Sequence, residues 1–350
     1  MSTVAEELVL RVEDPGRELD GVLLRTDLFK RLPPAEFVHD GDLWTLHLPR
    51  PAAVDRMEYL LELVLPDGTS ELVCDPTNPL TAPGPFGDKS VLEFPGYVPP
   101  AWIDDEEAPE GGVERLRLWS RTLRARVRGL LWSSPDAEPG APLPLLVAHD
   151  GPEYAELSLL RRFLDFAAAE KELPPMRAAL LAPVARDEHY SASARYSTAL
   201  ARDVLPALAR RAPTPPERDA RVGMGASLGA LALLHAHRTH PETFGALFLQ
   251  SGSFFRQRSD RQESAFTRFG RIARFMGSVL AAETWPDPVP VAITCGTGEE
   301  NLANNQATAA ALAAQGYGVD YSEHRDEHNW VSWRDAFDPH LLTLLQRVWG

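Results

Sequence analysis

A glycine–serine–glycine pattern in the second half of the chain has the clearest chemical meaning. Gly225, Ser227 and Gly229 form a GxSxG motif between a short apolar run and a strongly helical one. A serine at the apex of a sharp strand-to-helix turn needs small neighbours, so that the backbone fits and the hydroxyl projects. The N-terminus of the helix then favours the oxyanion that forms when the serine attacks a carbonyl. The motif predicts that Ser227 is a nucleophile and that the amide of Leu228 stabilises the oxyanion.

A serine nucleophile needs a histidine to accept its proton. The histidines that follow the motif are His235, His237, His240, His324, His328 and His340. The first three lie on or just after the helix that follows Ser227, and we expect them at the surface. His340 follows Asp338 and Pro339, where the final helix is expected to start. His328 lies in a polar loop after a β-like stretch, which suits a catalytic base, and His324 at the strand end stays an alternative.

The histidine in turn needs a carboxylate to orient it. An apolar strand over residues 289–295 is followed by Gly296, with Glu299 and Glu300 three and four positions further on. An acid just past the carboxyl end of such a strand lies where catalytic groups of open α/β sheets gather. Either glutamate could serve. Alternatively, both are solvated residues at the start of a helix expected over 307–314, where acids favour the helix dipole.

Two kinds of hydrophobic pattern indicate the elements that position these residues. Upstream of a connector rich in proline, acids and glycine at residues 96–112, short period-two runs at 43–48, 57–65 and 70–74 predict a β-sandwich. Downstream, strand-like runs at 143–148 and 178–181 alternate with helical segments at 157–169 and 196–209. This alternation is typical of a parallel sheet covered by helices. We therefore predict a β domain over residues 1–112 and an α/β domain over residues 113–350.

Composition excludes several classes of protein. The net charge is −15, and residues 1–112 hold 23 acids and 8 bases, whereas residues 113–350 hold 27 of each. Such a balance argues against nucleic acid as a partner. Cys74 and Cys295 form no metal-binding or disulfide pattern, and we predict no metal or cofactor. The N-terminus has acids where a secretory signal needs bases, and no apolar run could span a bilayer, so a cytoplasmic location and no membrane partner are expected.

Several of these segments together resemble a known family. Residues 225–230 (GASLGA), 248–254 (FLQSGSF), the acid after Gly296, and 328–334 (HNWVSWR) look like the putative-esterase (esterase D) family, enterochelin-esterase-like branch. The resemblance covers nearly the whole chain, since residues 75–79 (DPTNP) are similar to a segment of that branch's early-set domain. It implies an α/β-hydrolase fold preceded by a small immunoglobulin-like sandwich. By position, it implies Ser227 as nucleophile, His328 as base and Glu299 as acid, with Glu300 still possible.

The resemblance also implies residues around the reacting atoms. Residues 149–151 (HDG) look like the strand-to-loop step that supplies a second oxyanion donor. Pro152 has no N–H, so the donor is Gly151 or Glu153, with Gly151 ranked first. Residues 186–190 (RDEHY) look like a loop bordering the active site, which makes Arg186 and Glu188 candidates for substrate binding. Trp330 is a further candidate for substrate binding. The alternative for Arg186 and Glu188 is a structural ion pair.

These features together predict a serine esterase that acts on a small-molecule ester. One competing hypothesis is a glycan- or ligand-binding protein with a weakly active or inactive hydrolase scaffold, and another is an acyltransferase of the same fold. The acidic N-terminal region predicts a neutral or cationic acyl donor in preference to a polyanionic ferric catecholate, because an acidic rim repels anions. The oligomeric state is left open.

Overall fold

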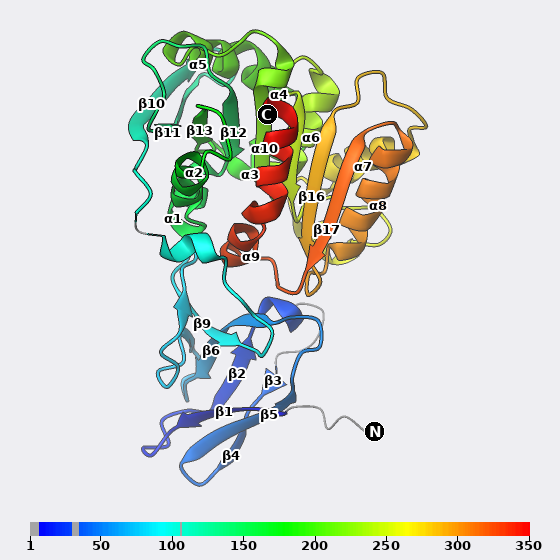
Figure 1. The fold of residues 1–350 in the computed structure, drawn as a ribbon. Coiled ribbons are helices and arrows are strands. Elements are labelled where there is room, and N and C mark those ends of the chain that lie inside the picture. The colour runs from blue at the N-terminus through cyan, green and yellow to red at the C-terminus, as the bar shows by residue number, and fades with distance from the viewer. Residues whose placement is uncertain (1–6, 30–34, 106) are drawn as a thin grey trace, which may run out of the picture. The chain divides into compact units, whose positions relative to one another are not determined.

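The computed structural model describes residues 7–29, 35–105 and 107–350 (Figure 1). Contacts divide the chain into two units. The first comprises Met1–Val98 together with two segments from late in the sequence, Gly296–Glu300 and Arg325–Ser332, and the second comprises the remainder. The predicted boundary at residue 112 stays a prediction. Residues 1–6, part of the segment on which the absence of a secretory signal was predicted, lie outside the described residues.

The first unit contains two β-sheets. One has the order β1-β5-β4 and the other the order β3-β2-β6-β9-β8, with β7 also paired to β6. The strands are β1 (Glu7–Glu13), β2 (Gly21–Arg25), β3 (Ala35–Glu36), β4 (Val38–Asp40), β5 (Leu43–Pro49), β6 (Arg56–Val64), β7 (Ser70–Val73), β8 (Thr81–Ala82) and β9 (Lys89–Glu93), with a short 3-10 helix η1 (Asp27–Phe29) after β2. The strands predicted at 43–48, 57–65 and 70–74 are confirmed as β5, β6 and β7.

Alternation of side chains along these strands builds the core of the sandwich. In β5, Trp44 and Leu46 are buried, whereas the residues between and beside them are more exposed, as expected when successive side chains point to opposite faces. They join Leu10 and Val12 of β1 in one cluster with the apolar residues of the other sheet, Val22, Leu24, Met57, Tyr59 and Leu61. The predicted small all-β domain is confirmed.

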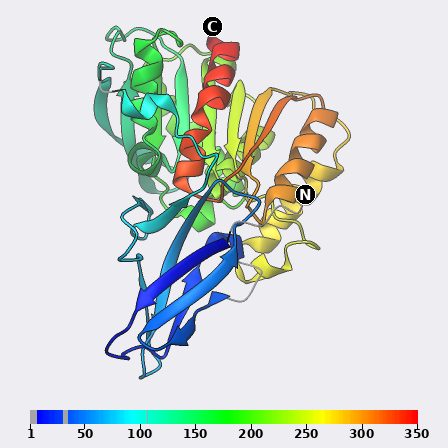
Figure 2. The same cartoon turned by 60° about the horizontal axis from the view of Figure 1, so that its bottom comes forward.

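The second unit is built on a sheet of eight strands in the order β10-β11-β13-β12-β14-β15-β16-β17, flanked by helices (Figure 2). The strands are β10 (Gly112–Ser120), β11 (Ala125–Ser133), β12 (Leu145–His149), β13 (Arg177–Leu181), β14 (Arg221–Ala226), β15 (Ala246–Gln250), β16 (Pro290–Gly296) and β17 (Gly318–His324). β10 and β11 pair antiparallel, whereas β13, β12, β14, β15 and β16 are mutually parallel. The α/β-hydrolase fold is thus confirmed.

The α-helices lie between successive strands of this sheet or follow its last strand, β17. They are α1 (Gly151–Leu157), α2 (Leu160–Ala169), α3 (Arg186–His189), α4 (Ala194–Ala199), α5 (Leu205–Arg211), α6 (Leu228–Thr239), α7 (Phe269–Ala281), α8 (Leu302–Ala314), α9 (Trp330–Asp335) and α10 (Leu342–Trp349). Shorter helical turns are η2 (Ala101–Asp104), η3 (Leu200–Val204), η4 (Arg218–Ala220), η5 (Arg261–Ala265) and η6 (Phe337–Leu341). Within the described ranges, no helix is long and apolar enough to cross a membrane.

Two predicted helices have different boundaries in the structure. The helix expected over 157–169 is divided, because Leu159 adopts a left-handed backbone with φ 52°, which separates α1 from α2. The helix expected over 307–314 begins earlier, at Leu302. His340 lies in η6, just before α10.

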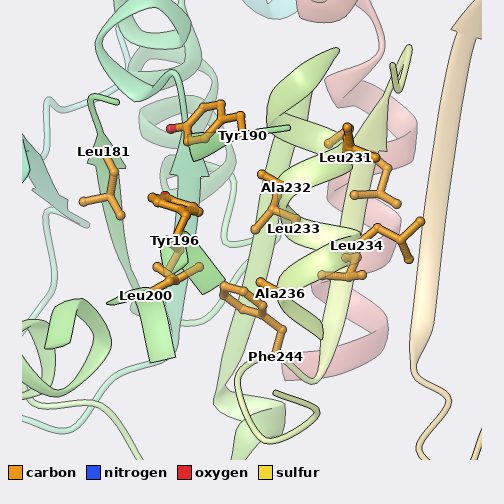
Figure 3. Close-up of a cluster of buried hydrophobic side chains, with 14 of the residues drawn as sticks. Leu181, Tyr190, Tyr196, Leu200, Leu231, Ala232, Leu233, Leu234, Ala236 and Phe244 are labelled. Atoms are coloured by element: carbon orange, nitrogen blue, oxygen red, sulfur yellow. The ribbon is translucent and has the colours of Figure 1, made fainter. Parts of the chain in front are cut away.

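Helix α6 lies at the centre of the hydrophobic core (Figure 3). Its buried residues include Leu231, Ala232, Leu233 and Leu234, so the helix is apolar on all sides, as expected for a helix enclosed by the fold. The prediction that His235, His237 and His240 are surface residues is therefore wrong. His237 and His240 are buried, and His235 contacts Ser197 of α4, because α4 covers this helix. Burial lowers the pKa of both His235 and His237 to about 4.

Candidate active site

Ser227 lies on a sharp turn between β14 and α6. Its backbone has φ 55° and ψ −122°, a conformation that residues with a side chain rarely adopt and that concentrates at functional sites. The flanking glycines leave the space that this turn needs. A Cβ on Gly225 would lie 2.7 Å from the carbonyl carbon of Gly229, and a Cβ on Gly229 would lie 3.3 Å from the Cβ of His149. The GxSxG spacing thus has a direct steric cause.

The loop after the next strand, β15, contacts the Ser227 hydroxyl. Ser227 Oγ lies 3.0 Å from Ser253 Oγ, and the Ser253 amide donates to the Ser227 carbonyl at 3.1 Å. This loop is itself held by side chains from later in the chain. Asn305 Oδ1 accepts from the Gly252 amide at 2.9 Å, and Trp333 Nε1 donates to Ser251 Oγ at 2.9 Å. Sequence reasoning quoted Ser253 only within the segment 248–254 and did not name Asn305. The polar residues directly after the buried strand β15 were the available signal for Ser253.

The loop after β12 carries the second candidate oxyanion donor. Asp150 has a left-handed backbone with φ 50°, and Gly151 is the first residue of α1, so its N–H has no partner within the helix. Only glycine fits at this position, because a Cβ would lie 2.2 Å from the backbone of Leu180. Leu228 occupies the same first position in α6. Both predicted donors are therefore first-turn amides at helix N-termini.

His149 joins this loop to the first turn of α6. It is fully buried, and burial lowers its pKa to about 4, so the imidazole is neutral at neutral pH. Its Nδ1 lies 3.2 Å from the Gly229 carbonyl, which can only accept, so Nδ1 carries the proton and donates. Nε2 therefore accepts from the Tyr196 hydroxyl at 2.9 Å. This histidine is a structural link that sequence reasoning quoted only as part of a motif.

Arg186 and Glu188 do not pair with each other. Arg186 makes a bidentate ion pair with Asp150, with Nε 3.0 Å from Oδ1 and Nη2 2.9 Å from Oδ2. Glu188 instead accepts from Arg271 Nη1 at 2.8 Å and contacts Arg268. Arg186 thus holds the loop that precedes Gly151. Its predicted role in substrate binding, and that of Glu188, stays a prediction.

In the first unit, His328 and Glu299 form a short hydrogen bond. His328 Nδ1 lies 2.7 Å from Glu299 Oε2, and the other carboxylate oxygen, Oε1, accepts from the Gly296 amide at 2.7 Å. The Glu299 side chain has no exposed surface, whereas the His328 side chain is 25% exposed. A buried carboxylate with two such donors holds an imidazole in one tautomer and one orientation.

The remaining candidates lie near this pair in the sequence. Glu300 follows Glu299 and is half-buried, and His324 is the last residue of β17. Trp330, predicted to contact substrate, is the first residue of α9 and is half-buried. Across the ranges that the structure covers, no group of three or more histidine, cysteine, aspartate or glutamate residues could hold a metal ion.

The arrangement of strands explains why several of these residues come from segments that directly follow a strand. Strands β12, β13, β14 and β15 are parallel, and the segments that follow their carboxyl ends carry Gly151, Arg186, Ser227 and Ser253 respectively. This is the edge at which open α/β sheets place catalytic groups. A serine on a strand-to-helix turn, in such a sheet, defines the class of α/β-hydrolases.

Comparisons with known proteins also identify the chain as an esterase. The family described as "Putative esterase" matches residues 125–344, and the chain belongs to this family. It is 25% identical over 283 residues to the Iron(III) enterobactin esterase of Escherichia coli O6:H1 (strain CFT073), covering 79% of this chain and 68% of the relative. It is 28% identical over 250 residues to the Iron(III) enterobactin esterase of Dickeya dadantii (strain 3937), covering 67% and 56% respectively.

A solved structure shows the same fold over both units. The enterobactin esterase of Shigella flexneri, determined in the presence of enterobactin, superposes with a TM-score of 0.76 at 21% identity and covers 98% of this chain and 92% of that one. The predicted resemblance to enterochelin-esterase-like proteins is confirmed. The chain is a carboxylic ester hydrolase.

Proposed function

We propose that the protein hydrolyses a carboxylic ester through an acyl-enzyme on Ser227, with His328 as general base and Glu299 as the residue that orients the base. The observation that carries this proposal is the 2.7 Å hydrogen bond between His328 Nδ1 and Glu299 Oε2. It leaves Nε2 as the ring nitrogen for proton exchange with the serine. The backbone of Ser227, with φ 55° on the turn into α6, supports its role as the nucleophile.

The reaction proceeds in two halves. Ser227 Oγ attacks the ester carbonyl while His328 Nε2 takes the hydroxyl proton, and the resulting oxyanion is stabilised by the amides of Leu228 and Gly151. The carbon–oxygen bond to the alcohol then breaks, and His328 returns the proton to the leaving alcohol. Water attacks the acyl-enzyme with His328 again as base, which releases the acid and restores the Ser227 hydroxyl.

Pre-steady-state kinetics with a p-nitrophenyl ester test this function. An acyl-enzyme mechanism predicts a burst of p-nitrophenolate equal to the enzyme concentration when deacylation is the slower half. A binding protein with an inactive scaffold predicts no turnover at all. An acyltransferase predicts that an added alcohol takes the acyl group in preference to water, so product analysis with and without the alcohol separates the two enzymes.

Replacing Glu299 with glutamine is expected to lower kcat by about 10³- to 10⁴-fold, because an amide does not hold the imidazole in the required tautomer. The matched control is Glu300→Gln, which changes the neighbouring glutamate by the same atoms and is expected to leave kcat within about threefold of the unmodified protein. Steady-state kinetics on a p-nitrophenyl ester measure both. Equal small losses in the two variants would indicate a serine–histidine dyad, and a larger loss for Glu300→Gln would reverse the assignment.

The substrate class is tested with a matched pair of esters, one neutral and one anionic. The net charge of −15 lies in residues 1–112, so the anionic ester is expected to have the lower kcat/KM at low salt. Added salt is expected to reduce the difference in kcat/KM between the two esters, because it screens this charge. Preference for the anionic ester at low salt would instead favour an iron(III) enterobactin-like substrate, as the names of the relatives suggest. The full chain is required, because Gly296–Glu300 and Arg325–Ser332 pack with the N-terminal residues.

A further inference from the structure

Buried polar side chains flank His328 on both sides. Asp326, Glu327 and Asn329 are all buried, and Glu327 is only 1% exposed. These residues do not face solvent as a polar loop normally would. Their partners are residues at the start of β6, about 270 positions earlier in the chain, which belong to the same unit. The His328 loop is therefore built on the β-sandwich.

Arg56, the first residue of β6, is the centre of these contacts. It is 2% exposed, and its Nη1 and Nη2 both donate to Glu58 Oε1 at 2.9 Å. Nη1 also reaches Asn329 Oδ1 at 3.4 Å and lies 3.9 Å from Asp326 Oδ2. One nitrogen of the guanidinium, Nη1, thus contacts the loop before and after His328, while Nη2 keeps a second bond to Glu58.

The same loop is tied to the segment that carries Glu299. The Asp326 carbonyl accepts from the Gly298 amide at 3.0 Å, and Asp326 Oδ1 accepts from Asn329 Nδ2 at 3.0 Å. Gly298 is closely enclosed, since a Cβ there would lie 2.7 Å from side-chain atoms of both Leu28 and Val54. The loop that carries His328 and the segment that carries Glu299 are therefore held together by hydrogen bonds of their own, outside the His328–Glu299 bond.

The charges of this cluster explain why the arginine matters. Glu58 also lies 3.6 Å from Lys89 Nζ, and Glu327 Oε1 accepts from the Glu58 amide at 3.3 Å. Burial raises the pKa of Asp326 to about 7 and that of Glu327 well above its usual range, whereas Arg56 favours the charged form of Asp326. Loss of Arg56 would leave Asp326 buried without the cation that favours its charged form.

We propose that Arg56 of the β-sandwich is a positioning residue for ester hydrolysis, because it holds Asp326 and Asn329 and thereby fixes His328 against Glu299. The inference rests on the proposed role of His328 as the base. It assigns to the β-sandwich of the first unit a part in the chemical steps of the reaction. Binding of the substrate is a separate role. A displacement of the base by about 1 Å can lower a rate by about 10²-fold, so the expected effect is large.

Arg56→Met is the first variant to test. We expect kcat on a p-nitrophenyl ester to fall by about 10- to 100-fold with KM within about threefold of the unmodified protein, since substrate contacts stay in place. Arg56→Lys, which keeps the charge but not the planar fork, is expected to recover only part of the loss. The matched control is Arg177→Met in the second unit, where a buried arginine donates to the Ala141 and Pro213 carbonyls at 2.8 and 2.9 Å. We expect this control to retain its kcat.

A spectroscopic measurement reports the geometry directly. The Nδ1 proton of a histidine bonded to a buried carboxylate gives a far-downfield ¹H NMR signal, and Glu299→Gln identifies it by removing it. We expect Arg56→Met to broaden or abolish this signal while the variant stays folded by circular dichroism. If Arg56→Met does not fold, Arg56→Met/Glu58→Met replaces it, because removing both members of a buried ion pair is less destabilising than removing one.

The possible outcomes separate this inference from the proposed function. A folded Arg56 variant with the downfield signal intact and kcat in the unmodified range overturns the inference, as does an equal loss of kcat in Arg177→Met. Turnover that survives Ser227→Ala overturns the proposed function, whereas the NMR signal still reports whether Arg56 positions the His328–Glu299 pair.

Discussion

Replacing His328 with alanine is expected to lower kcat by about 10³-fold or more, because in the proposed mechanism this residue takes the serine proton in the first half of the reaction and returns it to the alcohol. KM is expected to change little, since the proposed role of the imidazole is in proton transfer at the reacting atoms and not in anchoring the rest of the substrate. Steady-state kinetics on a p-nitrophenyl ester measure both constants. Circular dichroism checks that the variant folds, since the His328 side chain is only 25% exposed and the Glu299 side chain that it contacts has no exposed surface.

The matched control is His324→Ala. His324 is the last residue of β17, only four positions before His328, and we expect its replacement to leave kcat within a small factor of the unmodified protein. The opposite ranking of the two variants would contradict the assignment of the base. It would also remove the catalytic meaning of the hydrogen bond between His328 and Glu299.

Replacing Ser227 with alanine is expected to abolish the burst and to lower turnover by about 10³-fold or more, because the acyl-enzyme cannot form without the hydroxyl. The change removes one oxygen atom, and alanine can adopt the same backbone conformation as serine. The fold should therefore be retained. Burst kinetics and circular dichroism on the same samples test the two expectations together.

Ser253→Ala is the control for this variant, since its hydroxyl lies 3.0 Å from Ser227 Oγ. We expect a loss of about 10-fold at most, the size of one hydrogen bond between uncharged groups. If Ser253→Ala were the more damaging change, Ser253 and not Ser227 would be the nucleophile to consider.

Local sequence patterns were enough to predict the parts of the site that short segments determine. The GxSxG motif specifies a turn whose steric requirements involve only Gly225, Gly229 and their neighbours, and the structure has that turn. Likewise, acids placed just after a buried strand predicted that Glu299 or Glu300 would orient the histidine. The hydrogen bond to His328 is made by Glu299.

Contacts between distant segments were not predictable in the same way. Arg56 begins an ordinary strand, and nothing in its neighbourhood indicates that it reaches Asn329. Arg186 was considered with Glu188 because both lie in the segment 186–190 that resembles a family loop, yet its partner is Asp150. The burial of His237 depends on which other segments cover α6. One of them carries Tyr317, whose hydroxyl oxygen lies 3.1 Å from His237 Nε2. In each case the deciding contact is tertiary.

The central claim is that Ser227 carries the acyl group, and peptide mapping after covalent trapping tests it most directly. The full chain is treated with a p-nitrophenyl phosphonate, digested and analysed by mass spectrometry, with Ser227→Ala treated in parallel. We predict one phosphonyl group per chain, attached to Ser227, with loss of esterase activity in proportion to labelling and no adduct in the variant. An adduct on another residue, or full labelling of Ser227 with esterase activity unchanged, would contradict the account.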